Sequence, residues 1–256
     1  MKIYIRATLP GASGVSGNLY TLPGGRGELL AEARKQLTAD VNACVEACVN
    51  SGADTVIVRD DDNNGGNILR SALHQEAVLL TGYVPGKILP EIEGFDGFIM
   101  IGCAAMAGTS GATCSRTMSQ YNIRNLFING RRTGEIGFFA AAAAEKGVPL
   151  IMASGDDKAC REAAGWGHNV KLCIVKKGMS ENGALMPSLE YCRSLIAEKS
   201  AEAIRDIPGK ADFFIDKPVK LQIEYLSSDV HSASEADSRI SEGNGCSLEE
   251  AWLNCR

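Results

Sequence analysis

The sequence predicts an α/β fold in which helices flank a central, largely parallel sheet. Short apolar or β-branched segments alternate with helical segments along most of the 256 residues, and this alternation is the pattern of repeated β-α-β units. The clearest helical segment, 28–50, carries Leu37, Val41, Cys44 and Cys48 at intervals of three and four residues. A chain of this length can also bury a substantial core without disulfides.

The first half of the chain contains three predicted strands and one long helix. Residues 2–7 form the first apolar strand, and a glycine-rich coil separates it from the helix at 28–50, which Gly52 ends. The β-branched run TVIVR at 55–59 and the apolar run GFIMI at 97–101 predict the next two strands.

The second half continues the alternation of short apolar runs with helical patterns. Its predicted strands are 125–129, 149–153, 171–175 and 220–225. Its predicted helices are 136–146, 157–165 and 189–205. We therefore expect residues 1–226 to form one α/β domain. Residues 227–256 begin with the polar stretch SSDVHSASEADSRISEGNG, which is typical of a loop or a poorly ordered arm, and this segment is a candidate oligomerisation arm.

Composition excludes several classes of partner. The 26 basic and 31 acidic residues are mixed along the sequence, with a formal net charge of -5, so we expect binding neither to nucleic acid nor to an anionic membrane surface. No apolar run approaches the ~18 residues of a membrane span, and the N-terminal apolar stretch is too short for a secretory signal. We expect a cytoplasmic protein whose nine cysteines are free thiols.

The loops after residues 7, 59, 101 and 129 are the places to look for a site, because ligands of open α/β sheets collect at the carboxyl ends of the strands. The first loop contains GASGVSG, but a long coil rather than a helix follows it, which argues against a dinucleotide-binding turn.

The second loop has carboxylates in the pattern Asp60-x-Asp62-x-Asn64-Gly65, which is the first half of a calcium loop. Ser71 stands where such a loop needs a glutamate, so two interpretations remain: a hard cation held by these carboxylates, or a solvated acidic turn.

The last two loops contain candidate nucleophiles and a further carboxylate. Cys103 and Cys114 are candidate catalytic thiols, although small buried packing residues are the simpler interpretation because the sequence shows no histidine partner for either. Glu135 stands near the start of a predicted helix, where it either stabilises the helix dipole or serves as a ligand.

Taken in order, the segments MKIYIRATLPGASG, VIVRDDDNNGGNILRSALHQEAVLLTG, GFIMIGCAAMAGTSGATCSRTM and FINGRRTGEIGF resemble those of the zinc D-aminopeptidases associated with dipeptide transport. The resemblance extends over nearly the whole chain. It implies the family's α/β fold and ring-like homo-oligomers. It also implies two zinc ions held by an Asp, two His and two Glu, with another His acting on N-terminal D-residues of short peptides.

This sequence departs from the family at most of those positions. By the resemblance, the zinc ligands are replaced by Thr8, Pro10, Asp62 and Ala104, and the catalytic His by Arg116, whereas Glu135 is retained. Proline and alanine side chains offer no donor atoms, so the two-zinc site cannot form as such. Arginine is a permanent cation, and we expect Arg116 to face Glu135 and Asp62, either in an anion-recognising pocket or in an internal ion pair.

Three functional hypotheses follow. The first is a non-catalytic or repurposed family member that binds a small peptide or anionic molecule through Thr8 and Arg116 within a homo-oligomer, without a cofactor. The second is a hydrolase of short peptides or amides with a rebuilt site, in which one divalent metal is held by Asp60, Asp62 and Glu135, or Cys103 or Cys114 is the nucleophile with Arg116 beside it. The third is ordinary D-aminopeptidase activity, which the substituted ligands disfavour.

Overall fold

The structure is a computed structural model that describes residues 1–21, 27–62, 65–118, 122–209, 211, 213–226 and 239–255. Its largest element is a seven-stranded sheet with the strand order β3-β2-β1-β4-β7-β8-β9. Neighbouring strands are parallel except for the β8 and β9 pair. The strands are β1 (Lys2–Ala7), β2 (Thr55–Asp60), β3 (Ala77–Thr81), β4 (Gly97–Cys103), β7 (Leu150–Asp156), β8 (Lys171–Ser180) and β9 (Gly183–Leu185). The predicted α/β fold is therefore confirmed.

A second sheet of four antiparallel strands has the order β11-β10-β5-β6. It contains β5 (Ile123–Ile128), β6 (Arg131–Thr133), β10 (Val219–Tyr225) and β11 (Ile240–Gly245). The predicted strands at 125–129 and 220–225 therefore exist, but they belong to this separate sheet. The sequence does not predict the short strands β3, β6 and β9.

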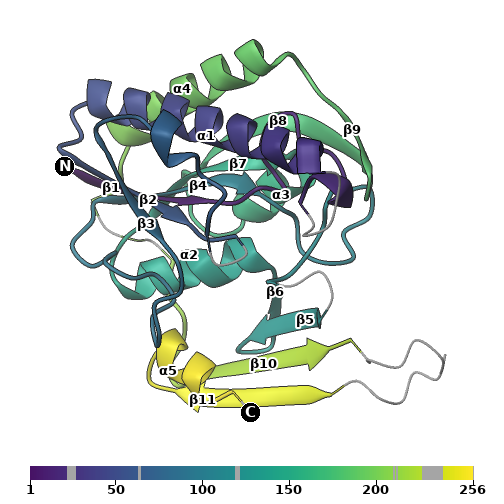
Figure 1. The fold of residues 1–256 in the computed structure, drawn as a ribbon. Helices are drawn as coiled ribbons and strands as arrows, with labels where there is room; N and C mark the ends of the chain where they lie inside the picture. Colours follow the sequence, from purple (N-terminus) through teal and green to yellow (C-terminus); the bar gives the residue numbers. More distant parts are fainter. Residues whose placement is uncertain are drawn as a thin grey trace.

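The helices form layers between and outside the sheets (Figure 1). They are α1 (Gly27–Asn50), α2 (Glu135–Glu145), α3 (Asp157–Ala163), α4 (Leu189–Arg205) and α5 (Leu248–Leu253). Helices α1 and α4 pack together on one face of the large sheet, and α2 lies on the other face, between the two sheets (Figure 1). Of the described helices, none is long and apolar enough to cross a membrane.

Helix α2 is apolar on every side because it has no solvent-facing side. Its sequence is EIGFFAAAAAE, and every residue from Glu135 to Ala144 is buried. A helix with apolar residues all round needs partners all round, and here the seven-stranded sheet lies on one side and the four-stranded sheet on the other (Figure 1).

The C-terminal segment is more regular than its polar sequence suggests. A loop was expected across 227–245, but Ile240–Gly245 pairs with β10 as β11 and is followed by α5. The inward positions of β11 are Ser241 and Gly243, and a Cβ atom on Gly243 would lie 2.0 Å from the carbonyl oxygen of Ala251. The inward positions of β11 therefore hold small residues, which let α5 pack closely. The large apolar residues that usually indicate a strand are not found there. Residues 227–238 lie outside the described part of the chain, and the role of the segment in oligomerisation stays a prediction.

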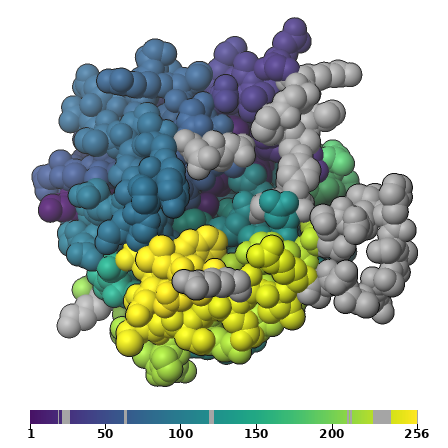
Figure 2. Space-filling model, turned by 60° about the horizontal axis from the view of Figure 1, so that its bottom comes forward, coloured from purple at the N-terminus to yellow at the C-terminus, as the bar shows by residue number. Residues whose placement is uncertain are grey.

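Helix α5 fastens this segment to the rest of the molecule. The backbone NH of Leu248 donates to Glu145 at the end of α2 (2.8 Å), and Glu249 accepts from the backbone NH of Ile88 (3.2 Å). Figure 2 shows the result, in which the C-terminal residues in yellow lie against the blue segment that precedes β4.

Candidate functional site

Charged side chains gather at the carboxyl edge of the large sheet, where the ends of β1, β2 and β4 lie level: Ala7 pairs with Asp60 on one side and with Ile101 on the other. The cluster consists of three arginines and three carboxylates, namely Arg6, Arg59, Asp61, Asp62, Arg116 and Glu135. All are buried except Asp61, which is partly buried. We call these six residues the ion-pair network. Its formal charges cancel.

Arg6 on β1 is the centre of one half of the network. Its Nε donates to Asp61 (2.6 Å) and its Nη2 donates to Glu135 (3.0 Å). The guanidinium carbon lies 3.7 Å from the ring centre of Phe139 on α2, a distance at which the ring face also attracts the cation. Arg59 on β2 donates to the other oxygen of Asp61 (3.1 Å).

Arg116 forms the other half, on the loop after β4. Its Nη2 donates to Asp62 (2.8 Å) and its Nε donates to Glu135 (3.2 Å). The same oxygen of Glu135 accepts from the backbone NH of Met118 (3.0 Å), and the second oxygen of Asp62 accepts from the NH of Leu9 (3.2 Å). The expected contact of Arg116 with Glu135 and Asp62 is thus present, and all four carboxylate oxygens have a donor.

These contacts favour the charged forms of Glu135, Arg116 and Arg6. Burial would raise the pKa of Glu135, but Arg116 and Arg6 together outweigh burial and hold that pKa below its usual range. Burial opposes the charge of Arg116, but Asp62 and Glu135 raise its pKa further above neutrality. Arg6 behaves in the same way between Asp61 and Glu135. Glu135 is therefore held as a carboxylate between two permanent cations.

The structure brings together only part of the carboxylate set considered for a metal. Asp62 and Glu135 both contact Arg116, whereas Asp60 accepts from Asn67 Nδ2 (3.0 Å) and from the backbone NH groups of Asn67 (2.7 Å) and Ile68 (3.0 Å). Asp60 thus closes the turn after β2. Within the described ranges, no group of three or more His, Cys, Asp or Glu side chains is arranged to hold a metal.

Thr8 uses its hydroxyl within the fold, and its role in ligand binding stays a prediction. Its hydroxyl donates to the carbonyl of Gly102 (2.7 Å), and the residue is buried. Pro10 and Ala104 have no side-chain donor atoms, so the residues present do not fit a two-zinc site. That mismatch rests on the chemistry of the donors, since each carboxylate oxygen of Asp62 and Glu135 already accepts from an arginine or a backbone amide.

The two candidate thiols lie in different surroundings. Cys103 at the end of β4 is buried, and burial raises the pKa of its thiol more than nearby Arg6 lowers it. Cys114 accepts from the backbone NH of Gly17 (3.1 Å), and burial raises its pKa against the opposing charge of Lys176. Burial holds both groups as neutral thiols, which favours their interpretation as packing residues. A nucleophilic role for either stays a prediction.

Buried polar residues that sequence reasoning missed hold the glycine-rich first loop in place. Lys176 on β8 donates from Nζ to the carbonyls of Pro10 (2.7 Å), Ala12 (3.0 Å) and Val15 (2.6 Å), and burial lowers its pKa to about 8. Asp40 on α1 likewise accepts from the backbone NH of Ser13 (2.7 Å). The described segment 10–15 of this loop is therefore held from two sides, by β8 and by α1.

Sequence reasoning also missed half of the ion-pair network. Arg6 and Arg59 stand in apolar strands and are register partners in the sheet. A charged residue inside a buried strand needs a counter-charge. That requirement was the signal that could have identified Asp61 as a member of the site.

The sequence matches the protein-family model described as D-aminopeptidase over residues 1–241. It is 32% identical to the D-aminopeptidase of Bacillus subtilis (strain 168) over 210 residues, which is 80% of this chain and 74% of that protein.

The fold is similar to that of a solved structure described as the Zn-dependent D-aminopeptidase DppA from Bacillus subtilis, a self-compartmentalizing protease. The TM-score is 0.88 at 26% sequence identity, and the match covers 99% of this chain and 95% of that one. The match of sequence along most of the chain and the match of fold lead to one conclusion: this chain belongs to the D-aminopeptidase family.

Proposed function

We propose that this chain is a D-aminopeptidase-family protein that has lost the family's two-zinc site and acts without metal catalysis, as a self-assembling scaffold that binds a small ligand. The observation that carries the proposal is the position of Arg116, which joins Glu135 to Asp62. By the resemblance, Glu135 is a retained zinc ligand and Asp62 replaces another. A guanidinium group thus pairs with the carboxylates that a metal would need.

The donor chemistry supports this proposal. Zinc takes about four N, S or O ligands in close geometry, and each oxygen of Glu135 and Asp62 already accepts at least one hydrogen bond. Arginine stays protonated in proteins, so Arg116 cannot take the part of a histidine base. Binding a metal would require the carboxylates to release Arg6 and Arg116, both of which are buried.

Self-assembly is the second part of the proposal. The solved relative is described as self-compartmentalizing, and its fold matches 99% of this chain, which supports a homo-oligomer here. The nine cysteines are free, seven of them buried, which supports a cytoplasmic location. Loss of the family's zinc ions need not disturb such an assembly, because the ion-pair network takes the place of the two-zinc site.

A hydrolase with a rebuilt site has less support. A single metal at Asp60, Asp62 and Glu135 would need Asp60 to leave the turn that it closes. A cysteine mechanism would need a thiolate, whereas burial raises the pKa of both Cys103 and Cys114.

The deciding experiment is the metal content per chain, measured by plasma mass spectrometry on protein purified without chelator or metal-affinity resin. The matched control is a variant that restores the family's ligands, with Thr8→Asp, Pro10→Glu, Asp62→His, Ala104→His and Arg116→His. We expect zinc in the restored variant and none near stoichiometry in the wild-type protein. Near-stoichiometric zinc or manganese in the wild-type protein would overturn the proposal.

A further inference from the structure

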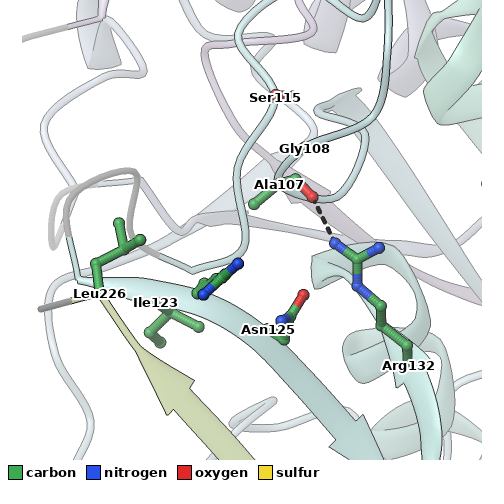
Figure 3. A pocket seen from close by; sticks show the side chains of 8 residues that line it. Ala107, Gly108, Ser115, Ile123, Asn125, Arg132 and Leu226 are labelled. Atoms are coloured by element: carbon green, nitrogen blue, oxygen red, sulfur yellow. Dashed lines mark hydrogen bonds between the residues drawn. The ribbon is translucent and has the colours of Figure 1, made fainter. Parts of the chain in front are cut away.

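A pocket of about 520 Å³ lies beside the loop that carries Arg116. Ala107, Gly108 and Ser115 of this loop form one wall. The strands of the small sheet form the rest, with Ile123, Arg124, Asn125, Arg132 and Leu226. Figure 3 shows Ile123, Asn125 and Leu226 along the small sheet on one side of the pocket and the loop on the other, with Arg132 reaching toward Ala107 from β6. The volume falls in the range of about 300–1,000 Å³ that is usual for small-molecule sites.

The two arginines of this pocket differ from those of the ion-pair network, because neither forms a salt bridge with a carboxylate in the described part of the chain. The charge of Arg132 does act on Glu162, because burial raises the pKa of that carboxyl and Arg132 lowers it by a smaller amount. Arg132 donates one NH to the carbonyl of Ala107 (2.8 Å), and its remaining donors have no protein acceptor among the described residues. Arg124 makes no hydrogen bond or salt bridge to a described residue. The nearby carboxylate of Glu224 already accepts from Asn125 (2.6 Å). The pocket therefore holds two cations whose donors are available to a ligand.

Part of the wall that the small sheet forms is apolar. Ile123 at the start of β5 and Leu226 just after β10 both line it, and Leu226 is 45% exposed. A ligand that fits both halves needs an oxyanion for the guanidinium groups and an apolar group against these two side chains. A carboxylate has the planar pair of oxygens that a guanidinium group binds with two hydrogen bonds.

We propose that this pocket binds a small carboxylic acid with an apolar substituent. The inference rests on the ligand-binding role proposed above, and it moves the anion contact from Thr8 and Arg116 to Arg124 and Arg132. Arg116 is only 8% exposed and is held by two carboxylates, whereas both pocket arginines are exposed. The loop from Ala104 to Arg116 then separates the ligand from the ion-pair network.

The test is isothermal titration of the full chain with N-acetyl-leucine and with its neutral isostere, N-acetyl-leucinamide. Arg124→Ala is the informative variant, because Arg124 is exposed and its loss breaks no hydrogen bond or salt bridge to a described residue. Arg70→Ala is the matched control, since it removes the same charge from an exposed site outside the pocket. Loss of one hydrogen bond to a charged group weakens binding by about tenfold or more.

We expect the acid to bind wild-type protein and Arg70→Ala equally, and to bind Arg124→Ala at least about tenfold more weakly. The amide should bind weakly to all three proteins. Equal affinity for acid and amide, full affinity of Arg124→Ala, or no binding of the acid at millimolar concentration would each overturn the inference. Failure of the acid to bind would contradict this inference alone, whereas zinc in the wild-type protein would contradict the proposed function. The two experiments therefore distinguish the two failures.

Discussion

Replacing Arg116 with alanine removes one cation from two buried carboxylates at once. Glu135 keeps Arg6 and the NH of Met118, but Asp62 keeps only the NH of Leu9. Breaking a buried ion pair by removing one partner costs about 3–5 kcal/mol, because the other charge stays buried without compensation. We therefore expect the free energy of unfolding to fall by at least about 3 kcal/mol, which lowers the melting temperature by about 6–12 °C in a chain of this size.

The pH dependence gives this prediction a second readout. In the wild-type protein the pKa of Glu135 is lowered below its ordinary value of 4.5. Its ionised form therefore stabilises the fold above that pH, and this stability is lost as pH falls through the lowered value. Without Arg116 the carboxylates lose that benefit, so the wild-type and Arg116→Ala proteins should differ most at neutral pH. The difference should shrink as the carboxylates become protonated.

The assay is urea unfolding followed by circular dichroism, at one fixed protein concentration because assembly adds to apparent stability. Arg205→Ala is the control, since its side chain is 70% exposed and its carboxylate partner lies 3.8 Å away. That control should change stability by no more than about 0.5 kcal/mol. Adding Asp62→Asn to Arg116→Ala should recover part of the loss, because it removes the orphaned charge. An unchanged unfolding curve for Arg116→Ala would refute the assigned role.

The remaining predictions concern the first loop. Burial raises the pKa of Asp40 to about 6, so the folded protein binds a proton here more tightly than the unfolded chain. The stability that this proton contributes is lost as pH rises from about 4 to 6, and the melting temperature should fall over that range. We expect Asp40→Asn to abolish this fall, and an unchanged pH dependence would contradict the prediction. Lys176→Met leaves three buried carbonyls without their donor and should cost about 3 kcal/mol or more in urea unfolding. Lys177→Met, at the exposed neighbouring position, should be near neutral, and equal effects of the two would refute the assignment.

The elements that could be predicted from the sequence are those whose own apolar residues indicate the type of element. The apolar runs of β1, β2, β4, β7 and β8 mark buried parallel strands, and the spacing of apolar residues in α1 and α4 marks helices that cover one face. Strand β11 could not be predicted in this way, because its pairing depends on β10 and its inward residues are serine and glycine. Short edge strands such as β6 and β9 depend likewise on their neighbours.

The contacts of the site can likewise be separated into those that the sequence predicted and those that depend on the arrangement of distant segments. The contact of Arg116 with Glu135 and Asp62 could be expected, because the resemblance places all three around one cavity. The partners of Arg6 and Arg59 depend on how the loop after β2 turns back toward the strand ends, which Asp60 and Asn67 determine. The pocket of Arg124 and Arg132 depends on the distance between the loop after β4 and the small sheet. No local pattern encodes that distance.

The placement of α2 between the two sheets makes the burial of this helix depend on both of them. Neither sheet can separate from the helix without exposing one side of a segment whose residues from Glu135 to Ala144 are all buried. Glu135, at the first turn, links this shared helix to the charges at the strand ends. We therefore expect a change in the charge balance at the site to affect both layers, and the two sheets to unfold in one transition.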